Sequence, residues 1–185
     1  AVPGLTIAAP MNEPELRNMM YTALGSGHPF MIRYPRGHGE GLPWRGEKFE
    51  ALPVGRGRRL REGDDVALVS VGTVGNAAAR AAERAAAEGV NAAHYDLRFV
   101  KPLDEALLDE VGRKFRRVVT VEDGALRGGV GEAVAAFFND RGYDVRVHRL
   151  GIGDEWVEHG TPGQLYALCG YDEEGILRAL LDTRA

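Results

Sequence analysis

Arg36 is the residue of this sequence best placed to do chemistry. It ends an apolar run and follows a proline in Phe30-Met-Ile-Arg-Tyr-Pro-Arg-Gly37. Pro35 fixes its own φ angle and favours extended geometry at Tyr34, while Gly37 lets the backbone turn. The guanidinium would then stand at the end of a strand, and its planar fork suits phosphate or carboxylate. Taken alone, the eight residues fit an ordinary loop arginine somewhat better than a ligand-binding one.

The glycine-rich stretch 124–131 is a second candidate, because it joins an expected strand to an expected helix. Backbone N–H groups at a helix N-terminus can hold an anion. However, no Lys-Ser/Thr pair follows the stretch, and its glycines do not have dinucleotide-fingerprint spacing. Glu122 and Asp123, just before it, would repel a diphosphate. We therefore predict a packing turn rather than a phosphate loop.

The histidines and the single cysteine show no catalytic or metal-binding pattern. The histidines at 28, 38, 94, 148 and 159 do not have metal-ligand spacing. His94 and His148 fall in expected strands and are interpreted as structural, and His159 is expected to be a hydrogen-bonded loop residue before an N-capped helix. Cys169 lies in an apolar helical pattern and is expected to be a buried structural thiol. The sequence thus displays no self-contained active site.

Length and composition allow one ordinary domain, or one domain with a piece of another. The 185 residues are 44% hydrophobic and 27% charged, as is typical of soluble globular proteins. The net charge of −4 and the scattered arginines give no nucleic-acid-binding footprint. No apolar run approaches the roughly 18 residues that span a bilayer, and no signal peptide pattern is present. We therefore expect a cytoplasmic protein that binds neither nucleic acid nor membrane.

The first residues predict a β-α-β unit. Leu5–Ala9 is an expected strand, and Asn12 is an expected helix N-cap with Glu15 completing a capping-box pattern. The helix should end near Leu24, and Phe30–Tyr34 should be the next strand. Because the chain opens without Met and this unit is too small to bury a core alone, we expect a fragment or a processed piece of a longer protein.

The remaining residues predict a complete α/β domain after a linker with a short strand around Phe49–Leu52. Val66–Val71 is a continuous apolar run, typical of a buried parallel strand. Thr73 should cap the helix that follows it. Alternating strands and helices predict a doubly wound, mostly parallel sheet. The further expected strands are Ala92–Leu97, Arg117–Val121 and Asp144–Leu150, and the last two expected helices are Pro162–Cys169 and Asp172–Thr183.

Several segments, taken in order, can be compared with a known family. They are Met31–Gly37, Leu52–Gly57, Tyr95–Asp104, Val121–Gly131, His159–Thr161 and Tyr171–Ile176. Together they resemble the C-terminal part of the 1-deoxy-D-xylulose-5-phosphate synthases, which are transketolase-like thiamine diphosphate enzymes, and the resemblance covers essentially the whole chain. The Asp-Leu-Arg…Pro-Leu-Asp pattern is shared with the β-subunits of 2-oxoacid dehydrogenases. Tyr-Pro-Arg-Gly combined with Arg-Phe-Val-Lys-Pro-Leu-Asp is narrower and favours the synthase.

The resemblance implies a division of the chain and an overall reaction. Residues 1–44 would be the C-terminal part of a pyrimidine-binding domain, 45–63 a linker and 64–185 a transketolase C-terminal domain. The family condenses pyruvate with glyceraldehyde 3-phosphate and releases carbon dioxide. Its product feeds isoprenoid, thiamine and pyridoxal biosynthesis. We therefore expect a fragment of a transferase that is not active alone.

Only Arg36 transfers from the family as a site residue. It matches the arginine that holds the phosphate of the aldehyde acceptor, with Tyr34 and Pro35 positioning it. The family's Gly-Asp-Gly segment for diphosphate and Mg²⁺ is absent from this sequence, and its catalytic glutamate and histidines lie upstream. The resemblance thus implies that thiamine diphosphate and Mg²⁺ are bound by the rest of the enzyme. Gly128, Gly129 and Gly131 are interpreted as architecture.

The resemblance also implies partners, and two alternatives stay open. The expected partners are the N-terminal part of the same enzyme, a second copy in a homodimer, and the substrates pyruvate and glyceraldehyde 3-phosphate. One alternative is the β-subunit of a 2-oxoacid dehydrogenase, which needs no phosphate-binding arginine. The other is a free-standing assembly or dimerisation domain without a catalytic part.

Overall fold

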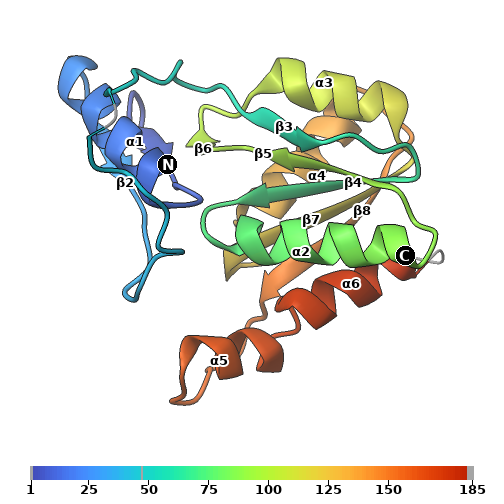
Figure 1. The fold of residues 1–185 in the computed structure, drawn as a ribbon. Coiled ribbons are helices and arrows are strands. Elements are labelled where there is room, and N and C mark those ends of the chain that lie inside the picture. The colour runs from blue at the N-terminus through green and yellow to red at the C-terminus, as the bar shows by residue number, and fades with distance from the viewer. Residues whose placement is uncertain (1, 47, 183–185) are drawn as a thin grey trace.

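The computed structural model describes residues 2–46 and 48–182. Along these residues the elements are β1 (Thr6–Ala8), α1 (Glu13–Gly25), β2 (Phe30–Ile32), β3 (Arg58–Arg61), β4 (Val66–Val71), α2 (Val74–Ala87), β5 (Ala92–Asp96), β6 (Phe99–Lys101), α3 (Glu105–Lys114), β7 (Arg117–Ala125), α4 (Val130–Asp140), β8 (Arg146–Ile152), α5 (Pro162–Leu168) and α6 (Glu173–Leu181). Figure 1 shows two parts side by side. We call the smaller part, formed by β1, α1 and β2, the N-terminal unit, and the larger part the C-terminal domain.

The C-terminal domain is built on a five-stranded sheet with the strand order β3-β5-β4-β7-β8. β4, β5, β7 and β8 run parallel, and β3 pairs antiparallel with β5 at one edge. Alternate residues of β4 face opposite sides: Val66 and Leu68 pack with α2 and α6, whereas Ala67 and Val69 pack with α3 and α4. Helices therefore cover both faces (Figure 1), and the predicted doubly wound, mostly parallel α/β fold is confirmed.

Small side chains let α2 lie close to this sheet. Ala78 and Ala82 are fully buried against it, and the chain turns away at Gly89, whose φ of 88° is readily adopted only by glycine. Thr73 stands at the N-cap position but makes no side-chain capping hydrogen bond, so the expectation of a threonine cap was wrong. The reason is its helical backbone, with φ −65° and ψ −22°, because a capping hydroxyl requires extended geometry.

The N-terminal unit completes its sheet and core with residues from later in the chain. β1 pairs parallel with β2 on one side and antiparallel with β6 on the other. No strand was expected at β6, which lies between β5 and α3. Phe99 of β6 and Leu52 join Ala8 and Met19 in a small buried cluster. The β-α-β unit is thus joined to the C-terminal domain through a shared sheet.

One sequence expectation needs correction in the segment expected to be a linker. The strand expected around Phe49–Leu52 was wrong, because this segment has no strand partner and instead binds α1 by a hydrogen bond of 2.8 Å from Leu52 N to Thr22 Oγ1. The strand of this region is β3, which pairs with β5.

The end expected for the last helix, Thr183, lies outside the described residues, in which α6 runs from Glu173 to Leu181.

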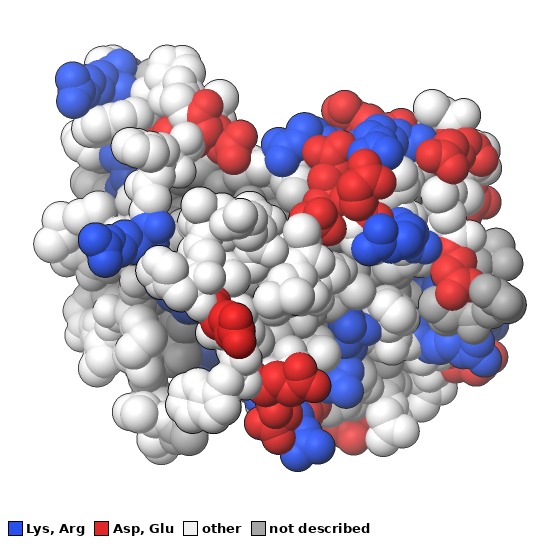
Figure 2. All heavy atoms as spheres, turned by 90° about the horizontal axis from the view of Figure 1, so that it is seen from below, with Lys and Arg blue, Asp and Glu red and all other residues white. Residues whose placement is uncertain are grey.

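The helices and one face of the surface were compared with the features that membrane-spanning or strongly charged binding proteins show. No helix among them is long and apolar enough to cross a membrane. Figure 2 shows the molecule from below, with acidic and basic side chains intermixed over the C-terminal domain and sparser over the N-terminal unit. On this face no broad area of a single charge stands out in the described part of the chain.

Candidate substrate-binding cleft

A cleft of about 490 Å³ lies between the N-terminal unit and the C-terminal domain. One wall is formed by residues 10–13 and the first turn of α1, and another by residues 34–40. The N-terminal turns of α2 supply the C-terminal domain's side, together with Tyr166 of α5 and Tyr171 between α5 and α6. The cleft therefore opens where strands β1 and β4 of the two sheets end and their helices begin, the usual location of ligands in open α/β folds.

Arg36 lines this cleft and is exposed. β2 ends at Ile32, two residues earlier than expected, so the segment Tyr34–Gly37 lies beyond the strand and bends at Arg36 and Gly37. Among the described residues, Arg36 makes neither a hydrogen bond nor an ion pair. We call Tyr34–Gly37 the Arg36 turn. The guanidinium of Arg36 is available for an anion that enters the cleft.

The segment after the Arg36 turn is held by Glu13 at the start of α1. Glu13 Oε1 accepts a hydrogen bond of 2.7 Å from Gly41 N. Its pKa is lowered because its own backbone N–H and that of Gly41 donate to the carboxylate. Its second oxygen, Oε2, is buried without a hydrogen-bond partner among the described residues. Glu13 thus stays ionised and ties the exit of the turn to the opposite wall of the cleft.

The segment before the Arg36 turn is held by Asp123 of β7. Arg33 donates a hydrogen bond to the Asp123 carbonyl oxygen, and its guanidinium lies 3.9 Å from the Asp123 carboxylate. The same carboxylate accepts from the Tyr171 hydroxyl at 3.0 Å and from the Tyr166 hydroxyl at 3.4 Å. Burial raises the pKa of both tyrosines, and the negative charge of Asp123 raises it further. Both hydroxyls therefore remain protonated and act as donors.

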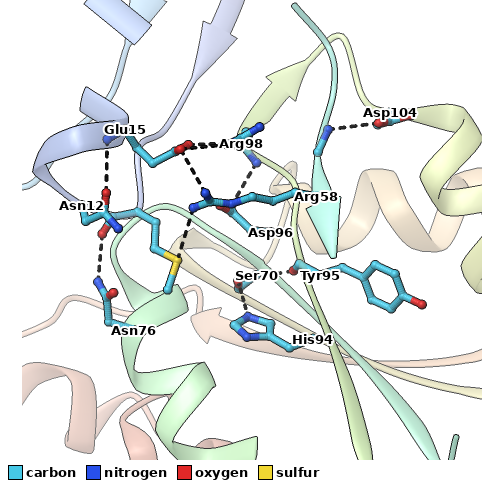
Figure 3. A network of polar contacts seen from close by, with 12 residues as sticks. Asn12, Glu15, Arg58, Ser70, Asn76, His94, Tyr95, Asp96, Arg98 and Asp104 are labelled. Atoms are coloured by element: carbon cyan, nitrogen blue, oxygen red, sulfur yellow. Dashed lines mark hydrogen bonds and ion pairs between the residues drawn. The ribbon is translucent and has the colours of Figure 1, made fainter. Parts of the chain in front are cut away.

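A separate, largely buried set of charges joins the two parts, and Figure 3 shows it from close by. Glu15 of α1 receives two hydrogen bonds from Arg98, both 2.8 Å long, and a third of 3.1 Å from Arg58. Arg58 also donates to Asp96 at 3.1 Å. We call Glu15, Arg58, Asp96 and Arg98 the buried joint. The capping box expected for Glu15 was wrong, because two guanidinium groups offer its carboxylate stronger, charge-assisted bonds.

The buried joint is strained as well as charged. Arg98 has a φ of 58°, which side-chain-bearing residues rarely adopt. Its backbone N–H donates to Asp96 Oδ1 at 3.1 Å, which helps to hold this conformation. Burial raises the pKa of Asp96, and the positive charge of Arg58 opposes that rise. Beside the joint, Asn12 caps α1, and Asn76 of α2 donates to the Met11 carbonyl oxygen at 2.8 Å (Figure 3).

The glycine-rich turn does not offer an open anion site. The buried Glu122 carboxylate accepts hydrogen bonds of 2.8 Å from Val130 N and Gly131 N at the start of α4. A side chain at Gly131 would lie 2.5 Å from Thr120 Oγ1, so glycine is needed for packing. The prediction of a packing turn is therefore confirmed, and the helix N-terminus is filled by the chain's own carboxylate.

Among the other residues considered in the sequence, His38 lines the cleft, whereas His94, His159 and Cys169 do not. His94 is buried and within 2.8 Å of Ser70 Oγ. His159 is exposed in the loop before α5 and has no hydrogen-bond partner among the described residues, so that part of its interpretation was wrong. Cys169 is a half-buried free thiol at the C-terminal end of α5. It is therefore less buried than expected.

The described residues do not fit a diphosphate–metal site. Among them, no group of three or more His, Cys, Asp and Glu side chains could hold a metal ion. The N-terminus of α4 is closed by Glu122. The cleft lining does contain groups that sequence reasoning missed, namely Glu13, Tyr166 and Tyr171. Sequence reasoning also missed that Asp123 is bonded to both tyrosines. Glu13 and Asp123 were visible only as a helix-start acid and a strand-end acid.

Comparison with known proteins defines the class to which this architecture belongs. Residues 55–176 match the family described as "Transketolase, C-terminal domain", and the chain belongs to that family. Among solved structures, one described as "Split gene transketolase, inactive beta4 tetramer" superposes with a TM-score of 0.85 at 29% identity, covering 97% of this chain and 58% of that one. The whole described fold is thus that of a transketolase-type protein.

The curated relatives narrow the class. A 1-deoxy-D-xylulose-5-phosphate synthase from Bacteroides fragilis is 53% identical over 185 residues, covering 99% of this chain and 28% of the relative. A protein of the same name from Bacteroides thetaiotaomicron is 53% identical over 182 residues, covering 97% of this chain and 28% of the relative. The chain therefore spans little more than a quarter of their length. The predicted resemblance is confirmed, and it favours the synthase over the dehydrogenase β-subunit.

Proposed function

We propose that this chain acts as the C-terminal part of a 1-deoxy-D-xylulose-5-phosphate synthase. The complete enzyme would condense pyruvate with glyceraldehyde 3-phosphate, release carbon dioxide and form 1-deoxy-D-xylulose 5-phosphate. The observation that supports a role of this chain in the reaction is an exposed arginine, unpaired among the described residues, on the lining of a cleft. Identity of 53% to two synthases supports the choice of reaction.

Arg36 would bind the phosphate of the aldehyde acceptor. A phosphate dianion in a partly desolvated cleft needs a permanent cation with several donors, and the guanidinium fork provides both. Arg80 also lines the cleft but is less available, because it donates to Glu173 at 2.8 Å. Arg33, two residues before the cleft-lining Pro35, is bound to Asp123. Arg36 therefore remains the best candidate for direct phosphate contact.

The cofactor would be held elsewhere in the complete enzyme. Thiamine diphosphate and Mg²⁺ need a diphosphate–metal site, and the described residues provide no such cluster. We therefore assign the cofactor and the catalytic groups to the remaining part of the enzyme. Residues 1–44 would complete its pyrimidine-binding domain, 45–63 would link the domains, and 64–185 would form the C-terminal domain. A cytoplasmic homodimer is the assembly that we expect.

Replacing Arg36 with Ala in the complete enzyme tests this function. We expect the KM for glyceraldehyde 3-phosphate to rise about 100-fold, which corresponds to about 2.7 kcal/mol of lost binding. The KM for pyruvate should stay within twofold. Arg127, exposed and paired with Asp154 at 3.4 Å, provides a matched control, and its alanine variant should behave like the parent enzyme. An unchanged KM for the phosphorylated aldehyde in the Arg36 variant would remove the phosphate assignment.

A second candidate function is assembly without catalysis. The solved neighbour is described as an inactive tetramer of beta chains, so in that protein such chains assemble without activity. The deciding observation is whether a second polypeptide with a Gly-Asp-Gly…Asn segment is joined to this chain or co-purifies with it. Its presence would support the synthase. A homogeneous oligomer of this chain alone, purified from its native source, would support the assembly module.

A further inference from the structure

We propose that Asp123, in the C-terminal domain, is a positioning residue that sets the Arg36 turn for phosphate binding. This inference rests on the proposed function and extends it, because it gives the C-terminal domain a part in substrate recognition. Asp123 would not contact the substrate itself. It holds Arg33, and Arg33 fixes the backbone three residues before Arg36.

The Arg36 turn leaves its sheet immediately before this contact. The last hydrogen bond of the β2 edge to β1 runs from Arg33 N to Ala8 O at 2.8 Å. The next anchor along the chain, to α1, is the hydrogen bond of 2.7 Å from Gly41 N to Glu13. The direction in which the turn leaves the sheet therefore depends on where the Arg33 side chain is held. That place is Asp123, near the C-terminal end of β7.

Asp123 is well suited to this task because its own carboxylate is fixed. The Tyr171 and Tyr166 hydroxyls donate to its two oxygens at 3.0 and 3.4 Å, and the two rings lie 5.0 Å apart. Both tyrosines line the same cleft as Arg36. The side chains that fix Asp123 therefore also line the cleft. A ligand bound between the tyrosines and Arg36 would contact parts of the chain that are linked by hydrogen bonds through Asp123 and Arg33.

The exposure of Arg33 and Asp123 indicates that their contact positions the turn rather than stabilises the fold. The side chain of Arg33 is 57% exposed and that of Asp123 is 24% exposed. An ion pair in such a position adds little to folding stability. Its loss should therefore change the placement of the turn more than the stability of the fold. This predicts an effect on one substrate and not on the whole protein.

The experiment replaces Asp123 with Asn, and separately Arg33 with Met, in the complete enzyme. For both variants we expect the KM for glyceraldehyde 3-phosphate to rise about tenfold, while kcat and the KM for pyruvate stay within twofold. Because Arg33 acts through Arg36, adding R33M to R36A should raise the KM no further. Asp154→Asn is the matched control, since Asp154 forms an exposed ion pair in the same domain. It should leave both KM values unchanged.

The outcomes separate this inference from the proposed function. If R36A raises the KM for the phosphorylated aldehyde but D123N and R33M do not, Asp123 has no positioning role and the proposed function stands. If R36A has no effect, the proposed function itself fails. If D123N lowers the melting temperature and raises both KM values together, while R33M leaves them unchanged, Asp123 is structural and the inference is overturned.

Discussion

The buried joint and the Arg33–Asp123 contact beside the Arg36 turn both connect the N-terminal unit to the C-terminal domain, but the two regions use charge in opposite ways. In the joint, Glu15 and Asp96 are almost fully buried and each is bonded to a guanidinium. In the turn, the anchoring charges are partly exposed, and Arg36 itself has no partner among the described residues. The joint satisfies its charges within the protein, whereas the turn leaves one unsatisfied.

This difference indicates where a ligand can bind. A buried charge without a partner is strongly destabilising, so the joint must be complete before the protein can fold stably. An exposed arginine has no such requirement, because water solvates it until an anion arrives. The anchors of the turn are then needed for position rather than stability. The first prediction below removes a charge from the joint. The later ones distinguish groups that stabilise the fold from Arg36, which is free to bind a ligand.

The largest expected effect on stability comes from Glu15→Ala. This change leaves the Arg98 and Arg58 guanidinium groups without their carboxylate at a largely buried site. We expect a loss of about 3–5 kcal/mol in the free energy of unfolding, measured by chemical denaturation. The exposed Glu62, paired with Arg59, is a control whose alanine variant should lose less than about 1 kcal/mol. Equal losses in the two variants would contradict the distinction between buried and exposed pairs.

The pH dependence of stability tests His94, a buried histidine whose pKa is affected by Arg58 of the joint. Burial lowers the pKa of His94 to about 4, and the charges of Arg58 and Arg61 contribute. Between pH 6.5 and 4 the unfolded chain therefore binds a proton that the folded chain does not, so stability falls as the pH is lowered. The loss should reach about 3 kcal/mol at pH 4.

A variant without the imidazole isolates this contribution. His94→Asn should reduce the fall in stability between pH 6.5 and 4 by about 3 kcal/mol relative to the parent. Ser70→Ala removes the hydroxyl within 2.8 Å of the ring but keeps the buried imidazole. It should therefore retain the pH dependence. If H94N keeps the same dependence, other groups cause it.

A smaller effect is expected from Glu122→Ala at the N-terminus of α4. The change leaves the N–H groups of Val130 and Gly131 without an acceptor. We expect a loss of about 2 kcal/mol in unfolding free energy. Added acetate should restore part of this stability, and chloride at equal ionic strength should not. A loss that acetate does not reduce would show that the site closed by Glu122 cannot be reopened to an anion.

The sequence predicted the fold well where local patterns decide it. The apolar run of β4 and the alanine-rich α2 were correctly assigned, because buried parallel strands and tightly packed helices restrict residue type. β6 was missed because its three residues form a strand only through pairing with β1, which comes more than 90 residues earlier. A short segment carries no periodicity from which such a pairing could be predicted.

The candidate site was less predictable than the fold. Arg36 stood out because proline and glycine mark its turn, and the packing role of the glycine-rich stretch followed from the acids before it. The contact between Arg33 and Asp123 could not be predicted, because it joins residues from different sheets across 90 positions. Glu15 was misassigned because an acid in the first turn of a helix usually serves that helix. Here two arginines from the C-terminal domain compete for it.

The central claim is that Arg36 recognises the phosphate of the acceptor, and substrate discrimination tests it most directly. The measurement is the ratio of kcat/KM for glyceraldehyde 3-phosphate to that for unphosphorylated glyceraldehyde, in the complete enzyme and in its R36A variant. We predict that the ratio falls about 100-fold in the variant while kcat/KM for the unphosphorylated aldehyde stays within twofold. An equal loss for both aldehydes, with the ratio unchanged, would contradict the claim.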